Sequence, residues 1–131
     1  MSAVKNPMRS ALGRVRHLGS AKEGVQHWWA QRLTALALVP LILWFVASLA
    51  YLAGADHAGF VGWLARPYNA LLMIVLLAAG FHHAQLGLQV VIEDYVHREG
   101  CKLALLIVVK FAALLLALAG IFAVLKIAFG A

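Results

Sequence analysis

The sequence predicts an all-α membrane protein with three transmembrane helices in an up-down-up arrangement and a cytoplasmic N-terminus. Composition is the first observation behind this prediction. Of 131 residues, 64% are hydrophobic and only 12% are charged, and the mean hydropathy of +0.89 is far above that of a soluble domain of this size. The second observation is a set of long apolar stretches. The third is the uneven distribution of basic residues along the chain.

Residues 1–25 are predicted to form a basic tail on the cytoplasmic side. A continuous helix is disfavoured there by Pro7, Gly13, Gly19 and Gly24. The first 22 residues lack acidic side chains, as in a transit peptide, but a bacterial cytoplasmic tail has the same composition and is the interpretation we favour. A cleaved secretory signal is not expected, because the first apolar run begins only after 32 residues and is too long for one.

Residues 26–131 are predicted to form a membrane anchor with spans at about 30–54, 67–92 and 103–128. A helix needs about 20 apolar residues to cross a hydrocarbon core about 30 Å thick. Two charge-free runs, at 33–55 and 67–92, are long enough. The third stretch contains Lys110 and Lys126, whose long side chains can carry their ammonium groups toward the lipid headgroups.

Short segments of different composition precede or separate the spans. Trp28 and Trp29 lie before the first span, where aromatic rings gather at a membrane surface. Pro40 is expected to kink the first helix, which membrane helices tolerate. Residues 56–66 are expected to form a loop, and Pro67 to occupy the first turn of the second helix, where proline is accepted.

The second helix is expected to end near Val96, with a break at Gly100 and a third helix from about Lys102. So short a connection makes these two helices antiparallel. Small residues along the second helix let another backbone or a flat ligand come close, namely Ala78, Ala79, Gly80, Ala84 and Gly87. A chain of three helices buries little core alone, so we expect it to need a partner chain.

The basic residues indicate the orientation in the membrane. Six of them precede the first span: Lys5, Arg9, Arg14, Arg16, Lys22 and Arg32. The first connection has only Arg66, whereas the second has Arg98 and Lys102. The positive-inside rule therefore places the N-terminus and the second connection in the cytoplasm, or in the matrix for a mitochondrial inner membrane.

The same distribution of basic residues argues against nucleic-acid binding despite the net charge of +6. The single Cys101 excludes an internal disulfide.

Polar residues deep in the second span are the best candidates for function: His82, His83, Gln85 and Gln89. Polar groups inside a membrane usually face a partner. At about 100° per residue, His83, Gly87 and Asp94 lie near one helix face. Imidazole is a common axial ligand of haem iron. A glycine one turn from the histidine leaves room for the porphyrin plane, although a hydrogen bond from His83 to a neighbouring helix is an equally simple interpretation.

One helix supplies one haem ligand under this hypothesis. His82 and His83 point about 100° apart, so they cannot both bind one iron from one side. No other histidine lies deep in a span, so a six-coordinate haem needs its second ligand from another chain. Arg32, with His27 before it, lies where the haem propionates would need a cation. Arg32 as a topology determinant is the alternative.

At this point the residues resemble a known family. The second helix has a motif similar to that of the D-type anchor subunit of succinate dehydrogenases, His83-x3-Gly87-x3-Val91-x2-Asp94-Tyr95-Val96. The approach to the first helix is similar as well, with Gly24-Val25-x-His27 and Arg32-x-Thr34-Ala35. Length, span number and topology agree over nearly the whole chain. The sequence departs from the family in having His82 beside the motif histidine, and His97 where a lysine is familiar.

The resemblance implies a haem b whose axial ligands are His83 and a residue of the C-type cytochrome b anchor subunit. It also implies that Tyr95 donates a hydrogen bond to a ubiquinone carbonyl with Asp94 beside it. Arg32, in preference to His27, would approach the haem propionates. The chain would anchor a flavoprotein subunit and an iron–sulfur subunit to the inner membrane. It would contribute no catalytic nucleophile itself.

Three other functions stay open, and His82 remains a rival ligand to His83. A fumarate reductase anchor would run the reaction toward quinol oxidation, and the sequence does not decide the direction. A small transporter subunit would use His83 and Asp94 as a proton relay. An inert assembly scaffold would use neither. A b-type haem spectrum would distinguish the two redox functions from the other two.

Overall fold

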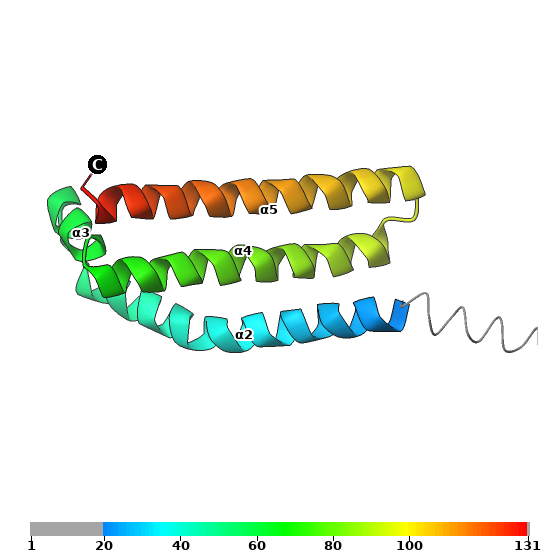
Figure 1. The fold of residues 1–131 in the computed structure, drawn as a ribbon, viewed down its shortest axis with the longest axis horizontal. Coiled ribbons are helices and arrows are strands. Elements are labelled where there is room, and N and C mark those ends of the chain that lie inside the picture. The colour runs from blue at the N-terminus through cyan, green and yellow to red at the C-terminus, as the bar shows by residue number, and fades with distance from the viewer. Residues whose placement is uncertain (1–19, 131) are drawn as a thin grey trace, which may run out of the picture.

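The computed structural model describes residues 20–130, with side chains from residue 24 onward. Most of the predicted tail at 1–25 therefore lies outside the described residues. The described part folds into helices only, which are α2 (Ser20–Tyr51), α3 (His57–Leu64), α4 (Pro67–Tyr95) and α5 (Glu99–Ala128) (Figure 1). Three of these, α2, α4 and α5, are long and apolar enough to cross a membrane. The predicted all-α class with three spans is confirmed.

The first helix begins earlier than predicted. It starts at Ser20, and Gly24, expected to interrupt helical structure, lies within it. A glycine inside a helix costs only about 1 kcal/mol relative to alanine. Adding residues to an existing helix is much easier than starting one. The helix that continues into the apolar span can therefore include Gly24.

Pro40 lies inside α2, which continues past it and bends in its second half (Figure 1). The chain leaves α2 through Gly54, whose φ of 88° is a conformation that favours glycine. The segment predicted as a loop at 56–66 contains the short helix α3, so that prediction is wrong. Asp56 caps this helix by accepting a hydrogen bond from the Gly59 amide at 2.8 Å.

The connection from α4 to α5 also differs from the prediction. Pro67 does begin α4, as expected, but Gly100 lies inside α5 rather than at a break. The turn is instead made by extended residues, with ψ of 112° at Val96 and 114° at Arg98. The helix α5 therefore begins at Glu99, whose acidic side chain suits the positive end of the helix dipole.

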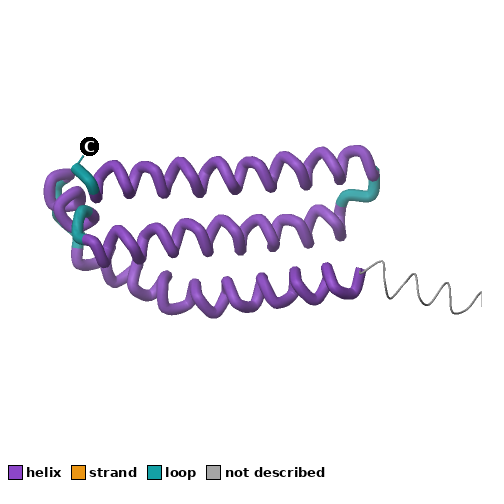
Figure 2. Tube along the Cα trace, in the orientation of Figure 1, coloured by secondary structure: helices purple, strands orange, loops and turns teal. Residues whose placement is uncertain are grey.

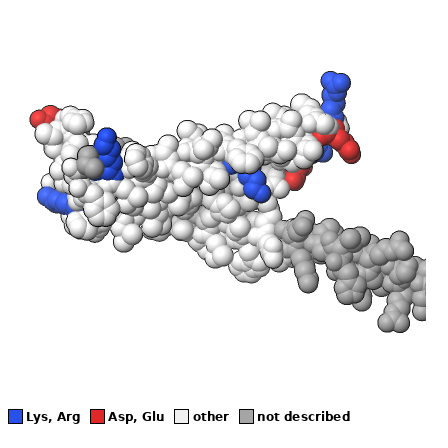
Figure 3. All heavy atoms as spheres, turned by 45° about the horizontal axis from the view of Figure 1, so that its top comes forward, with Lys and Arg blue, Asp and Glu red and all other residues white. Residues whose placement is uncertain are grey.

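The three long helices form a layer with α4 in the middle (Figures 1 and 2). Helix α4 packs against both α2 and α5, whereas the backbones of α2 and α5 do not come close to each other within the described residues. The start of α2 and the α4–α5 connection share one end of the layer, which confirms the up-down-up arrangement (Figure 1). On the face drawn in Figure 3, most charged side chains lie at the two ends.

The chain's own core lies at the end of the layer that holds α3. Its buried cluster consists of Trp63, Leu64, Ala70, Met73 and Val124, and Trp44 stacks on Trp63 with ring centroids 5.7 Å apart. Large apolar side chains remain exposed along all three spans. These side chains are available to lipid or to a partner chain.

Asn69 is the most deeply buried polar residue of this core, with 2% of its surface exposed. Its side-chain Nδ2 donates to the carbonyl oxygen of Trp63 at 2.8 Å, which ties the end of α3 to the start of α4. We expect Asn69→Leu to lower the free energy of unfolding by about 1–3 kcal/mol, because a buried carbonyl loses its main partner. Thermal denaturation in detergent measures this. Tyr68→Phe, at an exposed neighbour, is the control, and equal midpoints for both variants would contradict the expectation.

Candidate functional site

His83 is half-buried in α4 on the side that packs against α2, and it has a polar partner there. Its Nδ1 lies 3.0 Å from the hydroxyl oxygen of Thr34. That hydroxyl lies 2.7 Å from the carbonyl oxygen of Ala30 and 3.1 Å from that of Gln31, so its single proton is donated to the backbone. Only lone pairs remain for His83, so its Nδ1 is the donor. In the neutral imidazole, Nε2 then carries the free lone pair.

Gly87 follows His83 by one turn and lies beside open space. A Cβ atom built at Gly87 would meet nothing within 4 Å, whereas one at Gly80, on the other side of His83, would meet Leu38 of α2 at 3.9 Å. Packing within the described chain therefore does not require glycine at position 87. The open space at Gly87, one turn from His83, leaves room for a flat group bound to the imidazole. The role of the two residues at a haem stays a prediction.

His27 lies on the same face of α2 as Thr34, since seven residues make about two turns and span about 10 Å. Its Nε2 is buried and has no hydrogen-bond partner among the described residues. An unpartnered buried nitrogen is costly. A ligand or another chain that accepted or donated a hydrogen bond at His27 would remove that cost.

Arg32 lies elsewhere on α2, about 160° around the helix from Thr34. Its side chain is exposed, and its guanidinium carbon lies 5.3 Å from the ring centroid of Trp28. His27, unlike Arg32, therefore lies on the face of α2 that includes Thr34, the residue in contact with His83. The sequence-based preference for Arg32 as the residue nearer the haem propionates gains no support from the geometry of this chain.

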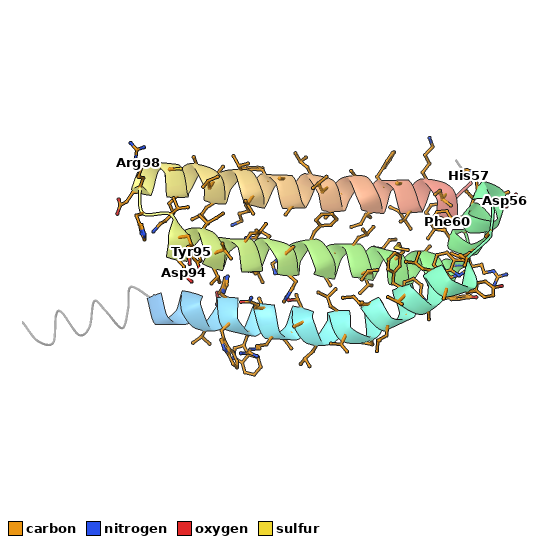
Figure 4. All side chains as sticks on the ribbon, turned by 180° about the vertical axis from the view of Figure 1, so that it is seen from behind. Asp56, His57, Phe60, Asp94, Tyr95 and Arg98 are labelled. Carbon is orange, nitrogen blue, oxygen red and sulfur yellow. The ribbon has the colours of Figure 1, made fainter. Side chains whose placement is uncertain are left out.

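Asp94 and Tyr95 lie at the end of α4, at the end of the layer where α2 begins (Figure 4). Arg98 is at this end too, whereas Asp56, His57 and Phe60 are at the other (Figure 4). The side chain of Tyr95 is 79% exposed. No hydrogen bond of either side chain is present within the described residues. Twelve residues of helix place Tyr95 about 18 Å along the axis from His83, so the two candidate sites are separate.

His82 points to a different part of the layer. It is exposed and lines a groove of about 460 Å³ between α4 and α5, whose other polar side chains are Gln85 and Lys110. No hydrogen bond orients His82 within the described residues. The two neighbouring histidines are thus distinguished by geometry, because only His83 has a ring nitrogen fixed by a partner.

The remaining polar residues of α4 bond to one another. The Nε2 of Gln85 lies 3.4 Å from Oε1 of Gln89, and the Nε2 of Gln89 lies 2.9 Å from Oε1 of Glu93. This row leads away from His82 toward the end of α4. No chain of side-chain hydrogen bonds joins His83 to Asp94 in the part of the chain that the structure describes.

Thr34 is the site residue that the sequence analysis missed, although it stands in the quoted motif. Its position seven residues after His27, which puts both side chains on one face of the helix, could have indicated that it belongs to the site. Among the described residues, no three histidine, cysteine or acidic side chains form a group that would hold a metal ion. One oriented imidazole beside an open helix face fits an iron whose other ligands come from a porphyrin and another chain.

These features define a class of protein, a three-span membrane protein that presents one oriented imidazole from its middle helix. Residues 6–119 match the family described as succinate dehydrogenase/fumarate reductase transmembrane subunit. The chain belongs to this family, and it is a multi-pass protein of the inner membrane.

Individual relatives agree with the family. The chain is 35% identical over 116 residues to the succinate dehydrogenase hydrophobic membrane anchor subunit of Rickettsia bellii, covering 88% of this chain and 93% of that one. It is 31% identical over 125 residues to the protein of the same name from Paracoccus denitrificans, covering 95% and 93%. The succinate dehydrogenase membrane anchor subunit of Reclinomonas americana is 29% identical over 101 residues, covering 75% and 84%.

Proposed function

We propose that the chain is the D-type membrane anchor subunit of a succinate dehydrogenase. In that complex the flavoprotein subunit oxidises succinate to fumarate, removing two electrons and two protons. The electrons pass through the iron–sulfur subunit to ubiquinone, which takes up two protons to become ubiquinol. This chain supplies the membrane attachment and part of two binding sites, while the cofactors supply the redox chemistry.

The first site is a haem b shared with the C-type cytochrome b anchor subunit. The hydrogen bond between His83 and Thr34 is the observation that carries this proposal, because it leaves Nε2 of His83 free to bind the iron of a haem. Gly87 leaves space for the porphyrin face. On α2, His27 lies about two turns before Thr34 on the same helix face, and its Nε2 has no hydrogen-bond partner among the described residues. A haem propionate would give this nitrogen a partner. When bound, the haem iron accepts and returns single electrons.

In this proposal Arg32 is a weaker candidate than His27 for contact with a haem propionate. It is exposed at the start of the first span, and its guanidinium suits a carboxylate. Because it lies on the far side of α2 from Thr34, it would reach a propionate only around the helix. A role in membrane topology needs no such reach.

The second site is part of a ubiquinone site at Tyr95 and Asp94. Both side chains are exposed at the end of α4, without a hydrogen-bond partner in the described part of the chain, so they are open to a ligand. A phenol hydroxyl can donate to a quinone carbonyl, and a carboxylate beside it can hold or pass a proton. In the proposed orientation this end faces the subunits that deliver electrons.

The alternatives have less support. The relatives named above are all succinate dehydrogenase subunits, which favours succinate oxidation over a fumarate reductase. A proton relay from His83 to Asp94 has no hydrogen-bonded path among the described residues. An inert scaffold would need neither the open face at Gly87 nor the oriented imidazole.

The proposed orientation, with the N-terminus in the cytoplasm, can be tested with the native cysteine. Cys101 is exposed near the start of α5, at the end of the layer where α2 begins. We expect a membrane-impermeant maleimide to label Cys101 in inverted membrane vesicles but not in intact spheroplasts, because the basic residues hold this end inside.

The matched control moves the cysteine to the other end of the layer. The double variant Cys101→Ser with Ala58→Cys places the thiol in α3, and its labelling should show the opposite pattern. Labelling of Cys101 only from the outside would overturn the orientation and would move Tyr95 away from the electron-delivering subunits.

A further inference from the structure

The hydroxyl of Thr34 is held in one orientation by its own helix. It donates to the carbonyl oxygen of Ala30 at 2.7 Å, with that of Gln31 at 3.1 Å. Threonine in a helix uses such a bond to select its side-chain rotamer. The oxygen therefore presents its lone pairs toward α4 from a fixed position.

This fixed acceptor has a single side-chain hydrogen-bond partner on α4 among the residues that the structure describes. The 3.0 Å contact with Nδ1 of His83 is the one side-chain hydrogen bond that joins α2 to α4 within the described residues. Ser48, also on α2, donates to the carbonyl oxygen of Trp44 at 2.7 Å in the same way, but no side chain of α4 bonds to it. Backbone bonding of a hydroxyl thus occurs on α2 without a histidine, and the histidine contact is particular to Thr34.

We propose that Thr34 is a positioning residue that holds His83 with Nδ1 as the hydrogen-bond donor, so that Nε2 faces the iron of haem b. This inference rests on the proposed function of His83. A histidine ligand commonly donates its other ring N–H to a neighbouring acceptor, which fixes the tautomer and the ring orientation and raises the basicity of the ligand. Thr34 supplies that acceptor from within the same chain.

Loss of the Thr34 hydroxyl should have different effects if Thr34 positions the haem ligand than if it only packs α2 against α4. Without an acceptor, the imidazole can rotate and is a weaker donor to iron, which disfavours the ferric state more than the ferrous state. The midpoint potential of the haem should then rise. Removing such an acceptor typically weakens metal binding about 10- to 100-fold. A contact that only holds α2 against α4 would change stability and leave the spectrum and the potential as they are.

The test uses the assembled complex carrying Thr34→Val, Thr34→Ala, Thr34→Ser or Ser48→Ala. Low-temperature EPR and potentiometric titration report on the ligation and on the haem potential. We expect the valine and alanine variants to shift the low-spin EPR signal and to raise the potential. A tenfold change in preference between the two iron states corresponds to about 59 mV. Thr34→Ser, which keeps the hydroxyl, should restore both properties, and Ser48→Ala should match the wild type.

One result would overturn the positioning role of Thr34, and a different result would overturn the haem proposal for His83. If Thr34→Val and Thr34→Ala both keep the wild-type signal and potential, Thr34 does not position the ligand, although His83 can still be one. Alanine is smaller than threonine, so this variant introduces no clash and keeps the test available if the valine variant does not assemble. If instead His83→Ala keeps the wild-type signal, the haem proposal itself fails.

Discussion

Replacing Tyr95 by phenylalanine is expected to lower ubiquinone reduction by the assembled complex by about ten- to 150-fold. The change removes one hydroxyl and keeps the ring. The quinone carbonyl that accepts the hydrogen bond gains negative charge as electrons arrive, and a hydrogen bond to such an acceptor contributes about 1.5–3 kcal/mol. The rate of succinate-dependent ubiquinone reduction in detergent measures the effect.

Two controls separate this effect from damage to the complex. Succinate oxidation with an artificial acceptor that bypasses the membrane site should remain near normal, and so should the haem spectrum. Tyr51→Phe removes a hydroxyl of similar exposure, 74% against 79%, at the opposite end of the layer, and it should leave ubiquinone reduction unchanged. If Tyr95→Phe keeps both ubiquinone reduction and inhibitor sensitivity, the quinone proposal is wrong.

Replacing His83 by alanine is expected to abolish the low-spin haem signal of the complex. The substitution removes one axial ligand, and a five-coordinate iron or one with a water ligand has a different EPR spectrum. The haem itself need not be lost, because the second ligand and the propionate contacts remain. The expected result is therefore a change of spin state at nearly constant haem content, measured by low-temperature EPR and by pyridine haemochrome.

His82→Ala is the matched control for this prediction. It removes the same side chain from the adjacent position, which lines the groove between α4 and α5 instead of facing Thr34. We expect its low-spin signal to match the wild type. If only His82→Ala disturbs the signal, the ligand is His82, and the hydrogen bond from His83 to Thr34 serves helix packing alone.

Much of the fold follows from hydropathy, because the bilayer demands long uninterrupted apolar helices. The errors lie at helix ends, where weaker effects compete. Gly24 and Gly100 were expected to break helices, yet both lie inside them. A single glycine costs too little to stop a helix that an apolar span already stabilises. The short helix α3 was missed because Asp56 was not recognised as its N-cap.

The candidate site was only partly predictable. Helical periodicity alone places His83 and Gly87 near one face. The contact with Thr34 depends on the register of α2 against α4, and no pattern within one helix gives that register. The same limit applies to His27 and Arg32, because the sequence alone does not show which side of α2 faces α4. The resemblance favours Arg32 as the propionate partner, and that assignment stays a prediction.

The colour of the assembled complex is the most direct test of the central claim that this chain helps to hold a haem b. The complex should be purified through a tag on this chain in a mild detergent, and its dithionite-reduced-minus-oxidised spectrum recorded. We predict that succinate-oxidising subunits copurify and that the spectrum shows b-type haem bands. We also predict that low-temperature EPR shows a low-spin haem signal, and that this signal is absent in His83→Ala. A complex that oxidises succinate and reduces ubiquinone but has no b-type bands would contradict the account.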